Sequence, residues 1–414
     1  MTSRERILCA INHKEADRVP RDLGSTPSSN ISAIAYNNLK KQLGIIGGHT
    51  RIYDVCQQVV IPEEDILKRF KIDVVDIGRA FNTKDSDWHD IILSDGSIAQ
   101  YPSWFNPVKQ EDGSYLAYLK NGELTAKMPV GATFFDGVLF PYEDEYPDNF
   151  DDLEQDMARV HWSAFAHSPW DRASEPDFWN QMRQNALYLR ETSDRAITLV
   201  MGCNLFEWGT FLRRIDNFLM DLYVEEDNVK ALIEALMEIH MRGLAKACQY
   251  LGDVVDIIRF GDDLGMTTAP LMSLEMYQKY FKHEHRTLFE YVKKHSQMKT
   301  FLHSCGSIHA FLPDLIECGL DIINPVQTNC LDMSPEKLKR DFGKDITFWG
   351  GGVDVLNSLH KGTPQQVKDD VKKRLEIFMK DGGFVFNPIH NILGEYKTEN
   401  VIAMFEAVDE FGNY

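Results

Sequence analysis

The sequence predicts an α/β protein, a (β/α)8 TIM barrel, and we expect residues 1–414 to form a single domain of this kind. From about residue 196 onward, short apolar runs alternate with amphipathic helical stretches, as in a parallel sheet with intervening helices. The runs in this part of the chain are "AITLVMG", "VVDIIRFGDD", "KTFLHSCGS", "LDIINPVQ", "ITFWGGGV" and "FVFNPIHNI". With "IDVVDIG" at residues 72–78 and "GVLFPY" near residue 140, the predicted strands number about eight, which favours a closed barrel.

An open, doubly wound sheet is the alternative, because it shows the same alternation of strands and helices. No GxGxxG segment follows a predicted strand, so a dinucleotide-binding sheet is less favoured.

The predicted helices carry their own boundary signals. Thr363 and Gln366 form a predicted capping box, and apolar residues then recur at helical spacing as far as Phe378.

Two parts of the chain depart from the βα rhythm. Residues 1–70 read mainly as helices, begin with a predicted Thr2/Glu5 capping box, and should cover one end of the barrel. Between about residues 87 and 130, "SDGS", "EDGS" and "KNGE" separate short runs at hairpin intervals. This pattern predicts a small antiparallel β-meander inserted into the barrel.

The composition excludes several classes of partner. The formal net charge of -19 argues against binding to nucleic acid or to an anionic membrane surface. No apolar run approaches the roughly 20 residues of a membrane span or a signal sequence, so we expect a cytoplasmic protein. The seven cysteines are scattered and odd in number, which indicates reduced thiols.

In a barrel, the functional residues lie at the C-terminal ends of the strands. The polar residues that end the predicted strands are Glu207, Asp262, Asp263, His303, Cys305, Asn324, Gln327, Asp354, Asn387, His390 and Asn391. We interpret Asn324, Gln327 and Asn387 as candidate substrate-binding residues.

His303 and Cys305 are the most informative of these residues. They are separated by one residue, so on a strand they point to the same side, with Cα atoms about 6 to 7 Å apart. Both can then reach one ion, and zinc accepts imidazole nitrogen and thiolate sulfur, usually with three protein ligands in a catalytic site. His390 at the end of the last strand is the best third ligand, and Glu207 or Asp262 is available to complete the shell.

Simpler interpretations stay open at this point. An HxC pair also arises by chance, from a packed cysteine and a hydrogen-bonded histidine. A Cys/His nucleophile is less favoured, because same-side neighbours on one strand are poorly placed for proton transfer. Asp262 and Asp263 could equally cap a helix, and Glu207 could equally pair with Arg213.

Four stretches together resemble the uroporphyrinogen decarboxylase superfamily over nearly the whole chain. They are "ERILCAINHKEADRVPRD", "RFGDDLGMTTAPLMSLEMYQKYF", "FLHSCGSIHAFLPDLIECGLDIINPVQ" and "FNPIHNI" followed by "TENVIAMFEAV". The resemblance implies a (β/α)8 barrel and one of two activities. These are cofactor-free decarboxylation of a porphyrinogen, or zinc-dependent methyl transfer to or from a corrinoid protein.

The resemblance favours methyl transfer. Decarboxylases of the superfamily open with an arginine-rich segment that binds the many carboxylates of the substrate, whereas "VPRDLGSTPSSN" contains Arg21 alone. The methyltransferase branch carries HxC at a strand end, which His303 and Cys305 match. Its third ligand is typically a cysteine, and "FVFNPIHNI" offers His390 instead.

We therefore expect a zinc-containing, corrinoid-dependent methyltransferase. A site with less sulfur leaves zinc a stronger Lewis acid, which suits O-demethylation of a methoxylated aromatic, with Asp262, Asp263 or Glu207 supplying acid catalysis. The methyl group would pass to the Co(I) of a separate small corrinoid protein, because no corrinoid-binding DxHxxG segment is present. The alternatives are a methylcorrinoid:thiol or tetrahydrofolate methyltransferase, and a metal-free decarboxylase.

Overall fold

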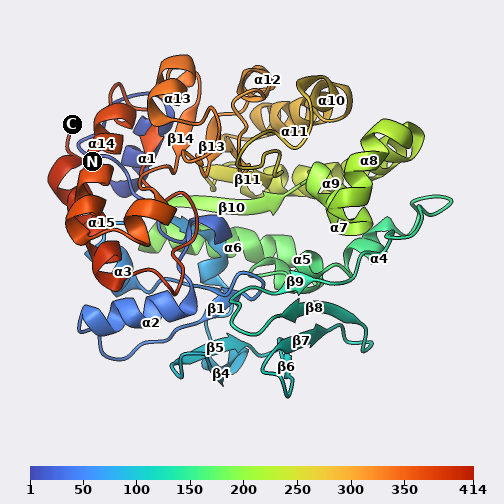
Figure 1. Cartoon of the computed structure of the whole chain (residues 1–414), viewed down its shortest axis with the longest axis horizontal. Coiled ribbons are helices and arrows are strands. Elements are labelled where there is room, and N and C mark those ends of the chain that lie inside the picture. The colour runs from blue at the N-terminus through green and yellow to red at the C-terminus, as the bar shows by residue number, and fades with distance from the viewer.

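Figure 1 shows a computed structural model of the whole chain, and the structure describes residues 1–414. Its centre is a parallel sheet with the strand order β15-β14-β13-β12-β11-β10-β3. The strands are β3 (Val74–Asp76), β10 (Ala196–Gly202), β11 (Ile257–Gly261), β12 (Lys299–His303), β13 (Ile322–Asn324), β14 (Thr347–Trp349) and β15 (Phe384–Val385). Seven of the predicted runs therefore form neighbouring strands, in chain order.

A short N-terminal segment closes the ring between β15 and β3. The backbone N–H of Asp22 donates to Phe386 O at 2.9 Å, and Phe386 N–H donates to Pro20 O at 2.8 Å. On the other side, Asp73 N–H donates to Arg21 O at 2.9 Å. Residues 20–22 thus run between the two edge strands, and the predicted (β/α)8 TIM barrel is confirmed.

The sequence interpretation assigned the eighth strand wrongly. Of "GVLFPY", only Gly137 lies in a strand, β9 (Asp136–Gly137), and that strand is antiparallel to β8 (Leu124–Met128) in the insertion. The true closing segment, "PRD", was missed because it is short, charged and begins with proline, so it lacks the apolar run by which buried strands are recognised.

Helices surround the sheet (Figure 1). They are α6 (Phe178–Thr192), α7 (Phe206–Arg213), α8 (Ile215–Val224), α9 (Glu226–Leu251), α10 (Leu274–Tyr280), α11 (Lys282–His295), α12 (Leu312–Glu317), α13 (Pro335–Phe342), α14 (Pro364–Phe378) and α15 (Thr398–Phe411). In α14 the predicted capping box of Thr363 and Gln366 is present, and Val367 and Val371 are buried. The apolar stripe of this helix therefore packs inward, as its periodicity predicts.

Helix α1 (Ser3–Ile11) closes the N-terminal end of the barrel. Its Thr2/Glu5 capping box is present, and Ile7, Ala10 and Ile11 are buried. These side chains pack in one cluster with a residue from each strand of the sheet, namely Val74, Ala196, Ile257, Phe301, Ile322, Trp349 and Val385. The N-terminal helical extension is thus a plug for one end of the barrel, and only the opposite end remains open to substrate.

The predicted antiparallel insertion consists of two small sheets, seen below the barrel in Figure 1. One pairs β4 (Trp88–Ile92) with β5 (Ile98–Pro102), and the other contains β6 (Val108–Lys109), β7 (Tyr115–Tyr118), β8 and β9. The first 70 residues also contain α2 (Ala33–Gln42), α3 (Glu64–Arg69) and a β1 (Ile52–Asp54)–β2 (Val59–Val60) pair, so they are less helical than expected. Helices α4 (Leu153–Met157) and α5 (His161–Ala164) lead back from the insertion to the barrel.

All seven cysteines are free thiols, in agreement with the scattered spacing. None of the helices combines the length and the apolar character needed to cross a bilayer.

Candidate active site

The structure brings together His303, Cys305 and His390, the three residues for which a metal-binding role was predicted. His303 ends β12, Cys305 follows two residues later, and His390 lies in the loop after β15. One ligand atom from each residue can be chosen such that all three lie within 4.8 Å of one another. The Cys305 Sγ is 3.4 Å from His303 Nε2. Two imidazole nitrogens and one sulfur thus converge on a single point.

Asn324 at the end of β13 orients His303. Its Oδ1 accepts a hydrogen bond from His303 Nδ1 at 2.6 Å, and its Nδ2 donates to Trp349 O at 2.8 Å, which fixes the direction of the amide. The proton of the imidazole is therefore on Nδ1, and Nε2 keeps a free lone pair on the side of Cys305. Asn324 is fully buried and does not line the cavity, so the predicted substrate-binding role does not match its position.

Burial keeps all three candidate ligands neutral in the absence of a cation. It lowers the pKa of His303 to about 3 and the pKa of His390 to about 4, and it raises the pKa of the Cys305 thiol well above its ordinary value. Neutral imidazoles are the form that binds a metal, and a bound cation would displace the thiol proton. Nitrogen and sulfur donors with an oriented histidine fit zinc.

The neighbouring residues Asp262 and Asp263 point in different directions. Asp262 is fully buried and accepts hydrogen bonds from the backbone N–H groups of Phe206 at 3.1 Å and Glu207 at 2.9 Å. It thus caps α7 and does not line the cavity, so its position does not fit the predicted acid role. Asp263 lines the cavity and accepts a hydrogen bond from Cys305 N–H at 2.8 Å. Its Oδ1 is 3.7 Å from His303 Nε2, which makes it the carboxylate beside the candidate metal ligands.

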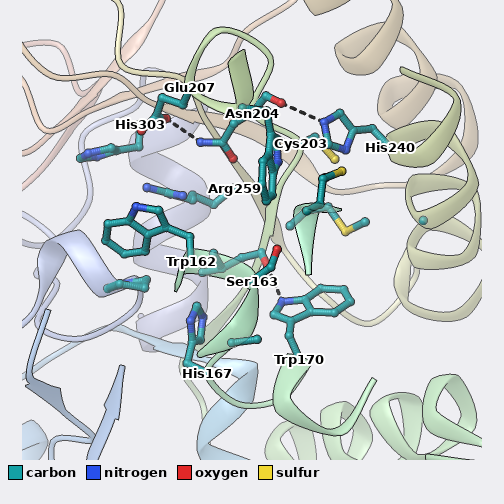
Figure 2. A pocket seen from close by; sticks show the side chains of 18 of the residues that line it. Trp162, Ser163, His167, Trp170, Cys203, Asn204, Glu207, His240, Arg259 and His303 are labelled. Atoms are coloured by element: carbon teal, nitrogen blue, oxygen red, sulfur yellow. Dashed lines mark hydrogen bonds between the residues drawn. The ribbon is translucent and has the colours of Figure 1, made fainter. Parts of the chain in front are cut away.

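Glu207 faces the cavity from the first turn of α7 (Figure 2). Its Oε2 accepts a hydrogen bond from Asn204 Nδ2 at 2.5 Å. Burial, together with the charges of Asp263 and Asp262, raises the pKa of Glu207 to about 8. It is therefore an acid that still holds its proton at neutral pH. The alternative pairing with Arg213 does not occur, because Arg213 forms its ion pair with Asp221 at 2.9 Å.

Gln327 and Asn387, also predicted to bind substrate, hold loops in place. Gln327 Oε1 accepts from Gly306 N–H at 2.9 Å, next to Cys305. Asn387 is fully buried, and its Nδ2 donates to the carbonyls of Asp22 at 3.2 Å and Ser29 at 3.3 Å. Neither residue lines the cavity. Both support the backbone around the site.

Two of the candidate ligands, His303 and His390, line a cavity of about 1060 Å³. Its wall contains large aromatic side chains from α5, α6, α7 and the segment between α5 and α6, namely Trp162, Trp170, Trp179, Trp208 and Phe211. Trp170 is fixed by a hydrogen bond from Nε1 to Val200 O at 2.6 Å. The polar groups that reach this wall include Glu207, Arg259, Asp263, His303 and His390. The cavity is thus an apolar slot with a small polar end, as ligand pockets generally are.

Sequence reasoning missed the tryptophans and Arg259. Trp162 and Trp170 lie in a stretch of short helices and turns without a clear period, so no pattern indicated which surface they line. Arg259 had a visible signal, because it is a charged residue within the apolar run "IIRFG" of a strand that is buried on both faces. A charge at such a position indicates a special local environment.

The protein is thus a (β/α)8 barrel with a cluster of two histidines and one cysteine at its open end. Residues 206–411 match the family model described as uroporphyrinogen decarboxylase (URO-D). The match makes the chain similar to the uroporphyrinogen decarboxylase family over about half of its length, and this half carries the candidate site.

Two solved structures are similar to this chain to different degrees, both at low sequence identity. A methyltransferase from Methanosarcina mazei is similar over 99% of this chain and 99% of its own, with a TM-score of 0.58 and 16% identity. A B12-independent methionine synthase from Shewanella sp. W3-18-1, in complex with selenomethionine, aligns with 55% of this chain and 66% of its own, with a TM-score of 0.29 and 15% identity. No curated protein sequence gives a significant match.

Proposed function

We propose that the protein is a zinc-dependent methyltransferase that takes a methyl group from a methoxylated aromatic compound and delivers it to a corrinoid protein. The observation that carries the proposal is the convergence of His303, Cys305 and His390 beside an aromatic cavity. The overall likeness to a methyltransferase supports it at the level of the fold.

His303, Cys305 and His390 would hold the zinc ion through Nε2, Sγ and an imidazole nitrogen. When bound, zinc acts as a Lewis acid toward the ether oxygen of the methyl donor. A donor set with one sulfur and two nitrogens leaves more positive charge on the metal than a thiolate-rich set. That difference favours demethylation of an ether over activation of a thiol.

The remaining groups have roles that follow from their positions. Asn324 keeps His303 in the tautomer whose Nε2 faces the centre of the site. The tryptophans provide flat apolar surfaces on which an aromatic ring packs and from which water is excluded. Glu207 holds a proton at neutral pH and faces the same cavity.

The overall reaction balances with these groups. The bond between the ether oxygen and the methyl carbon breaks, and its electron pair stays on oxygen. The methyl carbon is transferred to the cobalt of the corrinoid, which supplies the electron pair of the new bond as Co(I). The phenolate oxygen takes one proton, for which Glu207 is the donor.

Metal analysis and a transfer assay test this proposal. Purified protein should contain about one zinc per chain and should demethylate a member of a panel of methoxylated aromatics with free cob(I)alamin as acceptor. The assay follows the phenol by chromatography and methylcob(III)alamin by absorbance. His303→Ala and Cys305→Ala should lose both zinc and transfer, and retention of full transfer by either variant would refute the zinc-dependent mechanism.

The reverse direction, from a methylcorrinoid to a thiol or to tetrahydrofolate, is checked in the same preparation. Methylcob(III)alamin is incubated with a thiol or with tetrahydrofolate, and demethylation of the corrinoid is followed by absorbance. Fast demethylation by a thiol, together with no reaction of any aromatic ether, would assign the protein to that activity instead.

A further inference from the structure

Arg259 is a half-buried cation that forms no ion pair or side-chain hydrogen bond with the protein. It lies in the middle of β11, and its Nε is buried without a hydrogen-bond acceptor. The structure contains no ion pair or hydrogen bond from its guanidinium group to any other residue. The pKa of Arg259 is lowered because burial disfavours the charge. Leaving a guanidinium group in this state is costly unless something else in the cavity compensates it.

Other sheltered arginines of the chain are all paired with a carboxylate. The pairs include Arg6 with Asp73, Arg21 with Asp409, Arg190 with Asp256, Arg195 with Glu64, Arg213 with Asp221, and Arg374 with Asp370. At the cavity wall itself, Arg242 is paired with Glu154 at 2.7 Å. Arg259 therefore differs from the other sheltered arginines, because no carboxylate of the protein occupies its guanidinium group.

The position of Arg259 places its charge beside the candidate metal ligands. Residues alternate in and out along a strand, and Ile257 belongs to the cluster that fills the closed end of the barrel. Arg259 is the next inward residue, and Gly261, the one after it, is paired in register with His303. A Cβ atom at Gly261 would lie 3.0 Å from Arg259 Nη1, so the guanidinium group extends past this glycine. It reaches the cavity wall, where Figure 2 shows it near the centre of the view.

The cavity contains no carboxylate that satisfies this arginine. The charges of the wall residues Glu207 and Asp263 favour the charged form of Arg259, but neither carboxylate forms an ion pair with it. Glu207 bonds instead to Asn204, and Asp263 accepts a hydrogen bond from Cys305 N–H. With the pKa of Glu207 at about 8, this side chain is largely neutral at pH 7. The positive charge of Arg259 thus remains available to a ligand that enters between the tryptophans.

We propose that the methyl donor is an aromatic compound that carries a carboxylate, and that Arg259 binds this carboxylate. This inference rests on the proposed function and adds the chemical class of its substrate, a methoxybenzoate. The planar fork of a guanidinium group matches the two oxygens of a carboxylate, and the flat tryptophan walls match the ring. Arg259 would fix the orientation of the ring in the cavity, on the wall that also carries His303 and His390.

Calorimetric binding to the zinc-loaded, full-length protein tests the inference without methyl transfer. The two probes are 3-methoxybenzoate and 3-methoxybenzyl alcohol, which share the ring and the methoxy group and differ in charge. We expect the wild-type protein to bind the carboxylate about tenfold to hundredfold more tightly, the range for hydrogen bonds to a charged group. Equal affinity for the two probes would overturn the proposal and needs no variant.

Two variants locate the effect. Arg259→Met, which is similar in length and uncharged, should bind the alcohol as the wild type does and lose the preference for the carboxylate. Arg242→Met, at the already paired arginine of the same wall, should keep the preference. Retention of the preference in Arg259→Met would show that another group binds the anion. If Arg259→Met does not fold, Arg259→Gln is measured in its place.

The outcomes separate this inference from the proposed function. Tight, Arg259-dependent binding of 3-methoxybenzoate without any transfer to cob(I)alamin would leave the anion site in place and refute methyl transfer from such ethers. Efficient demethylation of neutral ethers, with the same rate in Arg259→Met, would support methyl transfer and refute the role of Arg259.

Discussion

The two ends of the barrel treat charged residues in opposite ways. At the closed end, Asp73 directly precedes β3 and is fully buried. Its charge is compensated by ion pairs with Arg6 at 2.6 Å and Arg18 at 2.8 Å. At the open end, Arg259 has no partner, and Glu207 is bonded only to a neutral amide. Paired charges at one end therefore hold the fold together, whereas at the other end Arg259 and Glu207, which have no ion-pair partner, are available for chemistry.

The apolar residues differ in the same way. Ile7, Ala10 and Ile11 of α1 complete a packed cluster with the strands and leave no room for a ligand at the closed end. At the open end, tryptophans, which are larger, line a cavity of about 1060 Å³. The position of a residue along the barrel axis thus predicts its role better than its chemical type does.

The largest expected effect is on stability at the closed end. Asp73→Asn should lower the free energy of unfolding by about 3–5 kcal/mol, because it leaves two sheltered arginines without their common partner. Urea denaturation followed by circular dichroism measures this. As a control, Asp253→Asn removes the exposed partner of Arg183 and should change stability by less than about 1 kcal/mol. A similarly small loss in Asp73→Asn would remove the contrast between the two ends.

The next effect is on catalysis and its pH dependence. A protonated Glu207 is present below about pH 8 and is lost as the pH rises through that value. The methyl-transfer rate of the wild type should therefore fall above pH 8, by about tenfold for each further pH unit. Glu207→Gln should be slower by at least about a hundredfold at pH 7 and should lack this decrease. Rates of methyl transfer measured between pH 6 and pH 10 for both proteins test this prediction. If the rate of the variant falls above pH 8 as that of the wild type does, Glu207 is excluded as the acid.

A smaller effect is expected from the residue that orients His303. Asn324→Ala should weaken zinc binding by about tenfold to hundredfold, as is usual for the loss of a partner behind a metal-binding histidine. Competition with a chromophoric chelator measures the affinity. Asn400→Ala is the matched control, because Asn400 is equally buried and donates to the carbonyls of Leu359 and Gly362. Equal zinc affinity in both variants would contradict the role of Asn324.

The smallest effect on stability is expected at Arg259. Arg259→Met removes an unpaired, half-buried charge, so the free energy of unfolding should stay within about 1 kcal/mol of the wild type or increase. Thermal and urea unfolding without ligand measure it. A loss comparable with that of Asp73→Asn would show that Arg259 is structural, and would contradict the assignment of the open end to binding.

The sequence predicted much of the fold because each barrel strand except one carries an apolar run. The exception, residues 20–22, is held by backbone hydrogen bonds whose partners lie about 50 and 360 positions away, at Asp73 and Phe386. Neither local propensity nor periodicity contains that information. For the same reason the apolar run "GVLFPY" predicts a barrel strand, although in the structure only its Gly137 lies in a strand, and that strand belongs to the insertion.

The candidate site was predictable to the extent that strand ends meet at one edge of a barrel. This reasoning found His303, Cys305 and His390, which converge, and Asp263 and Glu207, which line the cavity. It also collected Asp262, Asn324, Gln327 and Asn387, whose side chains turn toward backbone groups or toward His303. The side to which a polar side chain turns depends on the available partners, and the sequence does not reveal them.

The closure of the ring by residues 20–22 has a consequence for biosynthesis. The segment at Pro20 leaves the ribosome well before its partner Phe386 is made, because the two lie about 360 positions apart in the chain. Until then the nascent chain exposes two open sheet edges, which are liable to aggregate. His390 lies four positions beyond Phe386, so the last candidate metal ligand arrives with the segment that seals the ring. The chain would thus acquire its ability to retain a metal ion at the moment when its vulnerable edges disappear.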